Sequence, residues 1–425
     1  MCFYLLPRIN HSTQQIHSFI SETYTSDEKE FSDIIVNKTL HKYLNIVKTQ
    51  IDARSVEWDK YKKYTNPYEF IHSTIPATKQ SVSSLKPLSR SFYKMVEICK
   101  LMNILADLPT TTAGAQAPTE AGAPTEAGAQ ASAPTGESCK SFHLAEGPGG
   151  FIEAFVQLRK NEADTYYGMT LLNDRDYNVP GWRKSNVFLT KNKNVVIEKG
   201  KDGTGNLMNA ENLRDCYERY NGTMDFITGD GGFDFSVDFN NQEQSSLKLI
   251  FCQIAFAIAM QKINGCFVLK CFDTFTKMSL DLLYLLSMCY EQVYFVKPNT
   301  SRYANSEKYI VCKKFKLQQT EPIVKKCYKI MNEMNNGKNI ISLFNMDLPY
   351  LFTNKIEEYN AILGQQQIEN IASTLNLINN NLNKNENLET MKKNHITKCN
   401  TWCQIHNIPY NKQIQHVNIF MINKT

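Results

Sequence analysis

Short apolar runs alternate with longer amphipathic segments over the middle of the chain. The apolar runs have the length of strands and predict strands at residues 142–145, 165–169, 195–197, 224–228, 266–270, 293–296 and 308–312. The longer segments predict helices at residues 150–160, 211–220, 242–263 and 277–290. Strands that alternate with helices join as parallel neighbours, so this pattern predicts an α/β fold with a doubly wound, mainly parallel sheet.

The regions on either side of this pattern have helical periodicity. Before it, residues 27–63 and 89–105 show helix-like spacing of apolar side chains. From residue 321 onward the chain is rich in Asn and Lys, with amphipathic pieces at residues 323–334 and 363–388 and no strand pattern. We therefore expect an N-terminal helical extension, a core domain and a C-terminal helical region at residues 1–63, 64–316 and 317–425.

Residues 106–138 interrupt the core with repeats of the type AGAPTE. This segment has almost no large apolar side chain, so it cannot bury enough surface to offset the entropy lost on ordering. We expect a disordered, low-complexity insert within the core domain.

Composition narrows the class of protein only slightly. The chain of 425 residues has 47 Lys and Arg against 42 Asp and Glu, a net charge of +5 that permits a polyanionic partner without requiring one. Its 12 cysteines are scattered through apolar runs, which favours a reducing compartment on the cytosolic side. The longest apolar stretch, residues 249–260, falls short of the ~18 residues that cross a bilayer, so no membrane partner is expected.

A glycine-rich loop at residues 144–151, LAEGPGGF, follows a predicted strand and opens a predicted helix. In a doubly wound sheet this position suits a nucleotide-like ligand, because glycines let the backbone approach it and the helix offers free N–H groups. The loop is neither a dinucleotide fingerprint, which needs a glycine at Ile152, nor a phosphate-binding P-loop. A tight turn without a ligand is the alternative interpretation.

Two charged residues end strands at the same predicted edge of the sheet. Asp230 follows one strand and Lys270 closes the next, after Phe267, Val268 and Leu269. A buried lysine is costly unless a carboxylate is near, and Asp230 is a suitable partner. From these residues alone, the pair is either a structural ion pair or part of a catalytic site.

Seven motifs together resemble a known family. They are AEGPGGF (145–151), YGMTL (167–171), DGGF (230–233), LKCFDTFT (269–276), KPNTSRYANSEKYIVCK (297–313), NPYEFI (66–71) and SRSFYKM (89–95). Over about residues 60–316 the chain is similar to the FtsJ/RrmJ-like ribose 2′-O-methyltransferases, and more closely to their messenger-RNA cap 2′-O-methyltransferase branch. The resemblance implies a Rossmann-like, S-adenosylmethionine-dependent methyltransferase sheet with α-helical extensions. It departs from the family at Glu146, where relatives usually carry a small residue, and at Asn206, where an acid is common.

The resemblance also implies the functional residues. The catalytic tetrad would be Lys94, Asp230, Lys270 and Glu307. The cofactor, S-adenosylmethionine, would contact Glu146, Gly147, Pro148, Gly149, Gly150, Phe151, Met169, Thr170, Asn206 and Leu207. The RNA, expected to be capped messenger RNA, would contact Asn66, Tyr68, Asn240, Asn241, Gln242, Arg302 and Asn305. The helical ends are candidate docking surfaces for a capping or transcription protein.

The chemistry of methyl transfer to ribose fits this set of residues. A ribose hydroxyl is a very weak acid, so its attack on a sulfonium methyl group needs a base and in-line positioning. Lys270 is the candidate base, with Asp230 and Glu307 orienting the ammonium groups of Lys270 and Lys94. This chemistry requires no metal.

Three other interpretations are weaker. Asn66, Pro67 and Tyr68 match half of the Asn-Pro-Pro-Tyr box of base N-methyltransferases but lack the second proline. A methyltransferase fold that has become a non-catalytic RNA-binding or scaffold protein is disfavoured by the intact Lys, Asp and Glu motifs. A zinc module is conceivable near the C-terminus, but its spacing matches no common zinc class and favours a buried helix. Its potential ligands are His395, Cys399, Cys403 and His406.

Overall fold

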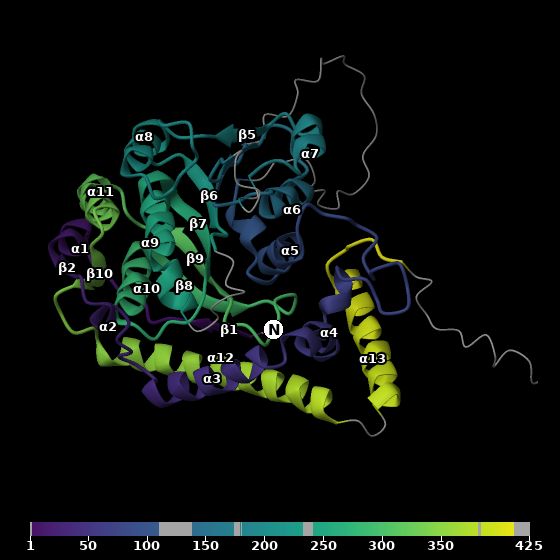
Figure 1. Cartoon of the computed structure of the whole chain (residues 1–425). Coiled ribbons are helices and arrows are strands. Elements are labelled where there is room, and N and C mark those ends of the chain that lie inside the picture. Colours follow the sequence, from purple (N-terminus) through teal and green to yellow (C-terminus); the bar gives the residue numbers. More distant parts are fainter. Residues whose placement is uncertain are drawn as a thin grey trace, which may run out of the picture.

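Eight strands form one mixed sheet in the order β1-β8-β9-β7-β6-β3-β4-β5 (Figure 1). The computed structural model describes residues 2–109, 138–173, 179, 181–232, 241–380 and 384–411. The strands are β1 (Cys2–Leu5), β3 (Lys140–Leu144), β4 (Thr165–Met169), β5 (Val195–Glu198), β6 (Met224–Gly229), β7 (Gln261–Cys271), β8 (Tyr290–Lys297) and β9 (Lys308–Phe315). β5, β4, β3, β6 and β7 are parallel neighbours, and β9 pairs antiparallel with both β7 and β8. The α/β, doubly wound prediction is confirmed.

Helices cover both faces of the sheet (Figure 1). They are α5 (Ser91–Leu101), α6 (Gly150–Arg159), α7 (Asn186–Lys191), α8 (Ala210–Tyr220), α9 (Gln242–Met260) and α10 (Lys277–Cys289). Successive side chains of a strand point to opposite faces. On β6, Ile227 packs with α8, α9 and α10, whereas Phe226 packs with α5 and α6. The apolar strands are therefore buried on both sides, which explains their continuous hydrophobic runs.

Both flanking regions are mainly helical, as expected, but they also carry strands. The N-terminal elements include α1 (Thr13–Phe19), β2 (Ile20–Thr25), α2 (Glu28–Phe31), α3 (Lys38–Asp52), α4 (Ser55–Thr65) and the 3₁₀ turns η1 (Glu69–Ile71) and η2 (Ile104–Asp107). The C-terminal elements are α11 (Glu321–Asn335), β10 (Asn339–Phe344), α12 (Tyr350–Asn379) and α13 (Lys384–Ile405). The expectation of no strand after residue 321 is wrong, because β10 pairs antiparallel with β2. β1 likewise joins the edge of the main sheet beside β8.

The flanking helices meet in a small core of their own. α3, α4 and α12 share a hydrophobic cluster that includes Leu44, Trp58 and Ile371, and Phe275 from the loop after β7 packs into it. The extensions are thereby attached to the end of the sheet at which β7 finishes. Among the helices that the structure describes, none combines the length and hydropathy of a membrane span.

The predicted insert begins later than residue 106. Ala106 and Asp107 belong to η2, the Asp107 carboxylate lies 2.6 Å from the Lys313 ammonium, and Leu108 is buried. Arg159 donates to the Pro109 carbonyl at 2.7 Å, so the folded chain reaches this residue. Sequence composition missed this boundary because the contacts of residues 106–109 are with distant parts of the chain. Residues 110–137 lie outside the described residues.

The insert provides a first test of the fold. Replacing residues 110–137 by a short Gly-Ser loop should leave the melting temperature nearly unchanged, because this segment lacks apolar side chains to bury. Leu108→Ala, immediately before it, should cost about 2–4 kcal/mol because it opens a cavity in the core. Thermal unfolding compares the two variants, and a large loss for the loop replacement would show that the insert packs against the core.

A buried histidine in the sheet makes stability depend on pH. His143 on β3 shares hydrogen bonds with the hydroxyls of Ser141 and Thr228, each at 2.9 Å, and is fully buried. Burial lowers the pKa of His143 to about 3. The unfolded chain therefore binds a proton at this residue at a higher pH than the folded protein does.

Below the unfolded pKa of about 6.5, each unit by which the pH is lowered should reduce the free energy of unfolding by about 1.4 kcal/mol through His143, until the folded pKa is reached. We expect the free energy of unfolding to fall between pH 6.5 and 4.5, and His143→Gln to flatten that slope. Urea titrations at several pH values measure both curves. An unchanged slope in the variant would contradict this account of His143.

Candidate active site

Three of the predicted tetrad residues lie at the ends of adjacent strands, on one face of the sheet. Lys270 is at the end of β7, Asp230 follows β6 and Glu307 precedes β9. Each is separated by an even number of residues from an apolar side chain of the same strand that packs beneath α5. These apolar side chains are Val268 for Lys270, Phe226 for Asp230 and Tyr309 for Glu307. Because alternate side chains share a face, all three charged residues point toward the helix that carries Lys94. Strand alternation thus accounts for the shared direction of Asp230, Lys270 and Glu307.

The four charged side chains form two ion pairs. The Lys94 Nζ lies 2.6 Å from Glu307 Oε1, and the Lys270 Nζ lies 3.1 Å from Asp230 Oδ1. Lys270 also donates a hydrogen bond to the backbone carbonyl of Asp230 at 2.6 Å. None of the four side chains is more than 16% exposed, so all four charged groups are largely shielded from solvent.

Burial and charge shift the pKa values of the first pair. Burial lowers the pKa of Lys94 in spite of Glu307, and the neighbouring Arg90 cation lowers it further. Burial alone would raise the pKa of Glu307, but Lys94 and Lys270 hold it well below its usual range. Glu307 is therefore a permanent carboxylate that anchors the Lys94 amine.

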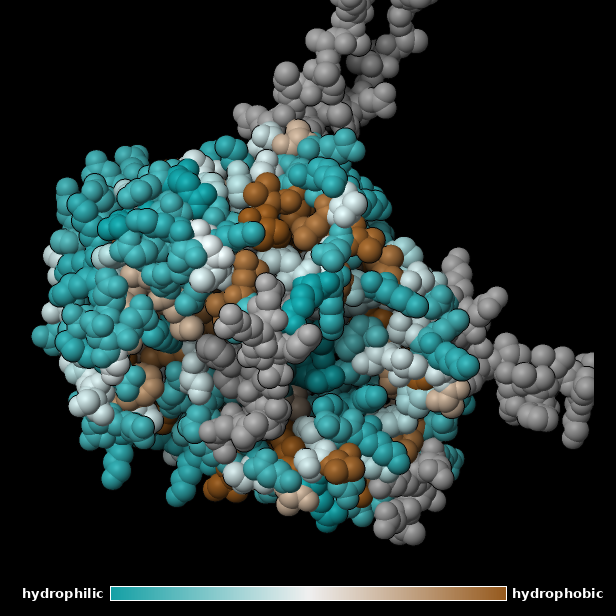
Figure 2. All heavy atoms as spheres, turned by 45° about the horizontal axis from the view of Figure 1, so that its top comes forward, coloured by the Kyte–Doolittle hydropathy of each residue, from teal (hydrophilic) through white to brown (hydrophobic). Residues whose placement is uncertain are grey.

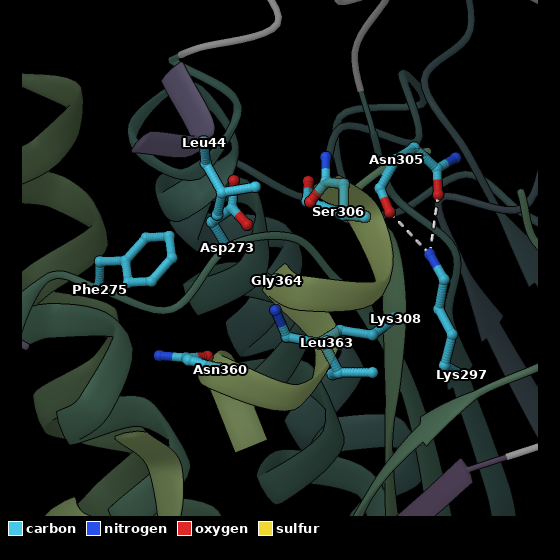
Figure 3. Close-up of a pocket in the computed structure, with 11 residues that line it drawn as sticks. Leu44, Asp273, Phe275, Lys297, Asn305, Ser306, Lys308, Asn360, Leu363 and Gly364 are labelled. Atoms are coloured by element: carbon cyan, nitrogen blue, oxygen red, sulfur yellow. Dashed lines mark hydrogen bonds between the residues drawn. The ribbon is translucent and has the colours of Figure 1, made fainter. Parts of the chain in front are cut away.

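The segment between β8 and β9 is held by two residues that sequence reasoning missed. Glu97 on α5 accepts hydrogen bonds from the backbone N–H groups of Asn299 and Thr300 at 2.9 and 3.0 Å. Lys297 donates to the Asn305 carbonyl and side chain at 2.7 and 2.9 Å (Figure 3). It also donates to the Glu307 carbonyl at 2.6 Å. Burial lowers the pKa of Lys297 to about 7. The signal that identified Lys270, a lysine closing an apolar strand, was equally present at Lys297.

A cavity of about 520 Å³ joins the tetrad to the glycine loop. Lys94, Asp230 and Lys270 line one part of it. The predicted cofactor residues in its wall are Glu146, Gly147, Pro148, Thr170, Asn206 and Leu207. The face in Figure 2 has hydrophobic side chains around a hollow, within a surface that is otherwise mostly hydrophilic.

The other predicted cofactor residues do not line the cavity but adjoin residues that do. Phe151 and Met169 are fully buried in the cores on the two faces of the sheet, and Gly149 and Gly150 begin α6. Sequence reasoning missed further residues of the wall: Ser89, Arg90, Ser91, Ala145, Leu171, Val179, Gly205, Met208, Gly232 and Leu249. Arg90 lies one helical turn before Lys94, a spacing that could have indicated it.

Glu146 shows how the cavity suits the cofactor. One carboxyl oxygen accepts hydrogen bonds from the backbone N–H groups of Phe151 and Ile152 at 2.6 and 3.2 Å, at the start of α6. The other oxygen is buried and has no hydrogen-bond partner among the described residues. Burial, reinforced by the nearby Asp230, raises the pKa of Glu146 well above its ordinary value. A ligand with positively charged or hydrogen-bonding groups, such as S-adenosylmethionine, fits a cavity with this unsatisfied oxygen in its wall.

A second pocket, of about 190 Å³, collects four of the predicted RNA-binding residues. They are Asn66, Gln242, Arg302 and Asn305, and α4 adds Trp58 and Lys62. The Arg302 guanidinium donates twice to the Glu69 carboxylate, at 2.7 and 3.0 Å. The Asn66 side chain accepts from the Tyr303 N–H at 3.0 Å. Several predicted RNA contacts therefore also hold the protein's own loops.

The remaining predicted RNA contacts lie elsewhere. Tyr68 is half-buried and packs against the hydrophobic cluster beneath α5. Asn241 is exposed at the start of α9. Asn240 lies outside the described residues.

The C-terminal cysteines are part of a packed helix. Cys399 and Cys403 on α13 are buried beside Trp402 in the same cluster beneath α5. Over the described part of the chain, no group of three or more His, Cys, Asp or Glu side chains is arranged to hold a metal ion. The alternative of a zinc module at these residues therefore has no support from the geometry.

Sequence comparison identifies the family. Residues 87–315 match the model of the FtsJ-like methyltransferases, which is more than half of the chain. The chain belongs to the FtsJ-like methyltransferase family. Its enzymatic class is that of a methyltransferase, and S-adenosylmethionine is its cofactor.

Three individual proteins illustrate the likeness. The Mus musculus cap-specific mRNA (nucleoside-2'-O-)-methyltransferase 1 is 33% identical over 224 residues, which are 51% of this chain and 26% of that protein. Its Dictyostelium discoideum counterpart is 29% identical over 314 residues, which are 72% of this chain and 39% of that protein. A putative ribosomal RNA methyltransferase structure from Plasmodium falciparum is 17% identical, with a TM-score of 0.34 over 54% of this chain and 98% of that one. The FtsJ-like chain thus spans only about a quarter to two fifths of these curated relatives.

Two glycines of one loop test the cofactor site. Gly205 and Gly203 both have positive φ, +65° and +75°, so alanine strains the backbone at either position. At Gly205 the added Cβ would lie 2.0 Å from the carbonyl oxygen of Thr170, a residue of the cavity wall, whereas at Gly203 it would meet nothing within 4 Å. We expect Gly205→Ala to weaken S-adenosylmethionine binding by at least about tenfold more than Gly203→Ala, measured by calorimetry. Equal affinities would place the cofactor away from this wall.

Proposed function

We propose that this FtsJ-like methyltransferase transfers a methyl group to a ribose 2′-hydroxyl of RNA, at the cap-proximal nucleotide of messenger RNA, with Lys270 as the general base. The observation that carries the proposal is a cluster of two buried lysine–carboxylate pairs, three of whose members, Lys94, Asp230 and Lys270, line the cavity beside the glycine loop. The similarity to cap-specific methyltransferases supports the choice of substrate.

The tetrad supplies what this reaction demands of a protein. When bound, S-adenosylmethionine provides an electrophilic methyl group. Lys270, as a free amine, takes the proton of the ribose hydroxyl at Nζ, and the Asp230 carbonyl and carboxylate hold that nitrogen in place. The new ammonium group is then stabilised by the Asp230 carboxylate beside it.

Lys94 and Glu307 have a supporting role in this proposal. Glu307 fixes the Lys94 ammonium, and both lysines line the same cavity. A cation held there would attract the oxygen of the target ribose without taking its proton. Because burial lowers the pKa of Lys94, this lysine is the alternative base, and substitution of each lysine distinguishes the two assignments.

The pocket beside α4 suits the RNA. Trp58 offers an aromatic surface, and Asn66 and Gln242 offer amide groups. Lys62 and Arg302 add N–H donors, although each is already paired with a carboxylate, of Asp59 and Glu69 respectively. Single-stranded RNA is typically bound by stacking and by hydrogen bonds to exposed base edges. We assign this pocket to a nucleobase on the cap side of the methylated ribose.

Lys270→Met keeps most of the apolar stem and removes the amine. Methyl transfer to capped RNA should fall by about 10²- to 10⁴-fold or more, with little change in cofactor affinity, because general-base catalysis is worth roughly that factor. Lys270→Arg should not rescue activity, since a guanidinium stays protonated. Lys262→Met, at the opposite end of the same strand, is the matched control and should retain activity.

The outcomes separate the parts of the proposal. Near-normal turnover of Lys270→Arg would make Lys270 a cation and leave Lys94 as the candidate base. Unchanged turnover in both Lys270 variants would reject the tetrad assignment. With the wild-type protein, mapping the methylated nucleotide on matched RNAs with and without a cap tests the substrate, and equal methylation of internal nucleotides would overturn the cap-proximal assignment.

A further inference from the structure

A third and wider hollow lies on the other side of the segment that leads into α5. This groove encloses about 740 Å³ and is formed by residues 72–93 together with Asn411. Two backbone hydrogen bonds join its walls, from the Ser84 N–H to the Pro409 carbonyl at 3.0 Å and from the Asn411 N–H to the Val82 carbonyl at 2.9 Å. In Figure 1 the segment before α5 runs beside the chain that follows α13. The groove is thus part of the folded structure.

The lining of the groove is suited to phosphate. It contains three cations, Lys79, Lys86 and Arg90, and none of its described lining residues is an Asp or a Glu. Five serine and threonine hydroxyl groups accompany them, from Thr74, Ser81, Ser83, Ser84 and Ser89. Lys79 and Lys86 are exposed, and neither forms an ion pair with a described residue. Cations interspersed with hydroxyl donors are the usual contacts of a nucleic-acid backbone.

The groove leads to the active site. Ser89 and Arg90 line both the groove and the cofactor cavity, and Lys94 of the tetrad lies one helical turn beyond Arg90. The Arg90 guanidinium donates to the Thr300 carbonyl at 3.2 Å, while its Nε is buried and has no hydrogen-bond partner among the described residues. A nucleic-acid strand bound in the groove would therefore continue past Arg90 to the tetrad.

We propose that this groove binds the phosphodiester backbone of the RNA strand that continues from the methylated nucleotide, away from the cap. The inference rests on the proposed function, which places a nucleobase on the cap side in the pocket beside α4. The two hollows share no lining residue, so one RNA can occupy both. Contacts of this kind carry no base sequence and depend strongly on salt.

The test removes charge from the groove and leaves the catalytic residues intact. Lys79→Gln combined with Lys86→Gln is compared with Lys191→Gln combined with Lys193→Gln, two exposed lysines at the amino end of β5. Methylation is measured on a capped dinucleotide and on a capped RNA of about ten nucleotides. We expect the groove variant to raise the KM for the longer RNA about tenfold, with kcat and the dinucleotide reaction unchanged. The slope of log KM against the logarithm of the salt concentration should decrease by about 0.7 for each phosphate contact removed.

Three results would overturn the inference. An unchanged KM for the longer RNA would show that the groove is not on the RNA path. An equal rise in the KM for the dinucleotide would assign these lysines to the cap side or to the stability of the fold. An equal rise in KM for the control variant would show that only the overall charge of the protein matters. Fluorescence anisotropy with uncapped single-stranded RNA gives a readout without catalysis, so weaker binding by the groove variant alone supports the groove even if methyl transfer to capped RNA fails.

Discussion

The burial of two ammonium groups in one corner of the fold is the constraint on which the candidate site depends. Lys94 and Lys270 come from a helix and a strand that are far apart in the chain, and each faces one carboxylate. Removing one partner from a buried pair leaves a charge without compensation, at a typical cost of about 3–5 kcal/mol. The position of α5 over the sheet is therefore fixed by these charges as well as by its apolar face. Glu97 on the same helix fixes the segment that ends in Glu307.

The terminal extensions complete the site. Lys48 on α3 forms a buried ion pair with Asp273, three residues after Lys270, at 3.0 Å. On α12, Gln367 donates to the Ala304 carbonyl at 3.0 Å. The loops after β7 and before β9 are thus held from outside the domain that matches the family model. The pocket assigned to the nucleobase exists only because these helices pack on the loops.

The sequence predicted the parts of the structure that have a local signal. The strand at residues 165–169 has the predicted bounds, and Asp230 and Lys270, predicted from the strand ends to be partners, form an ion pair. Pairings between distant segments have no such signal: β10 is short, and its partner β2 lies more than 300 residues earlier. The ion pair of Asp107 with Lys313 could not be predicted for the same reason. A capping or transcription protein at the helical ends and a cytosolic location stay predictions.

Glu69 connects the two surfaces assigned to RNA. Its carboxylate accepts two hydrogen bonds from Arg302 in the nucleobase pocket and lies 3.9 Å from the ring of His72, which lines the groove. Burial would raise the pKa of Glu69, but Arg302 and Arg90 hold it well below its usual range. The charge of Arg302 is therefore largely balanced within the protein. Net attraction for phosphate must come from cations without such a partner among the described residues, and Lys79 and Lys86 meet that condition beside the active site.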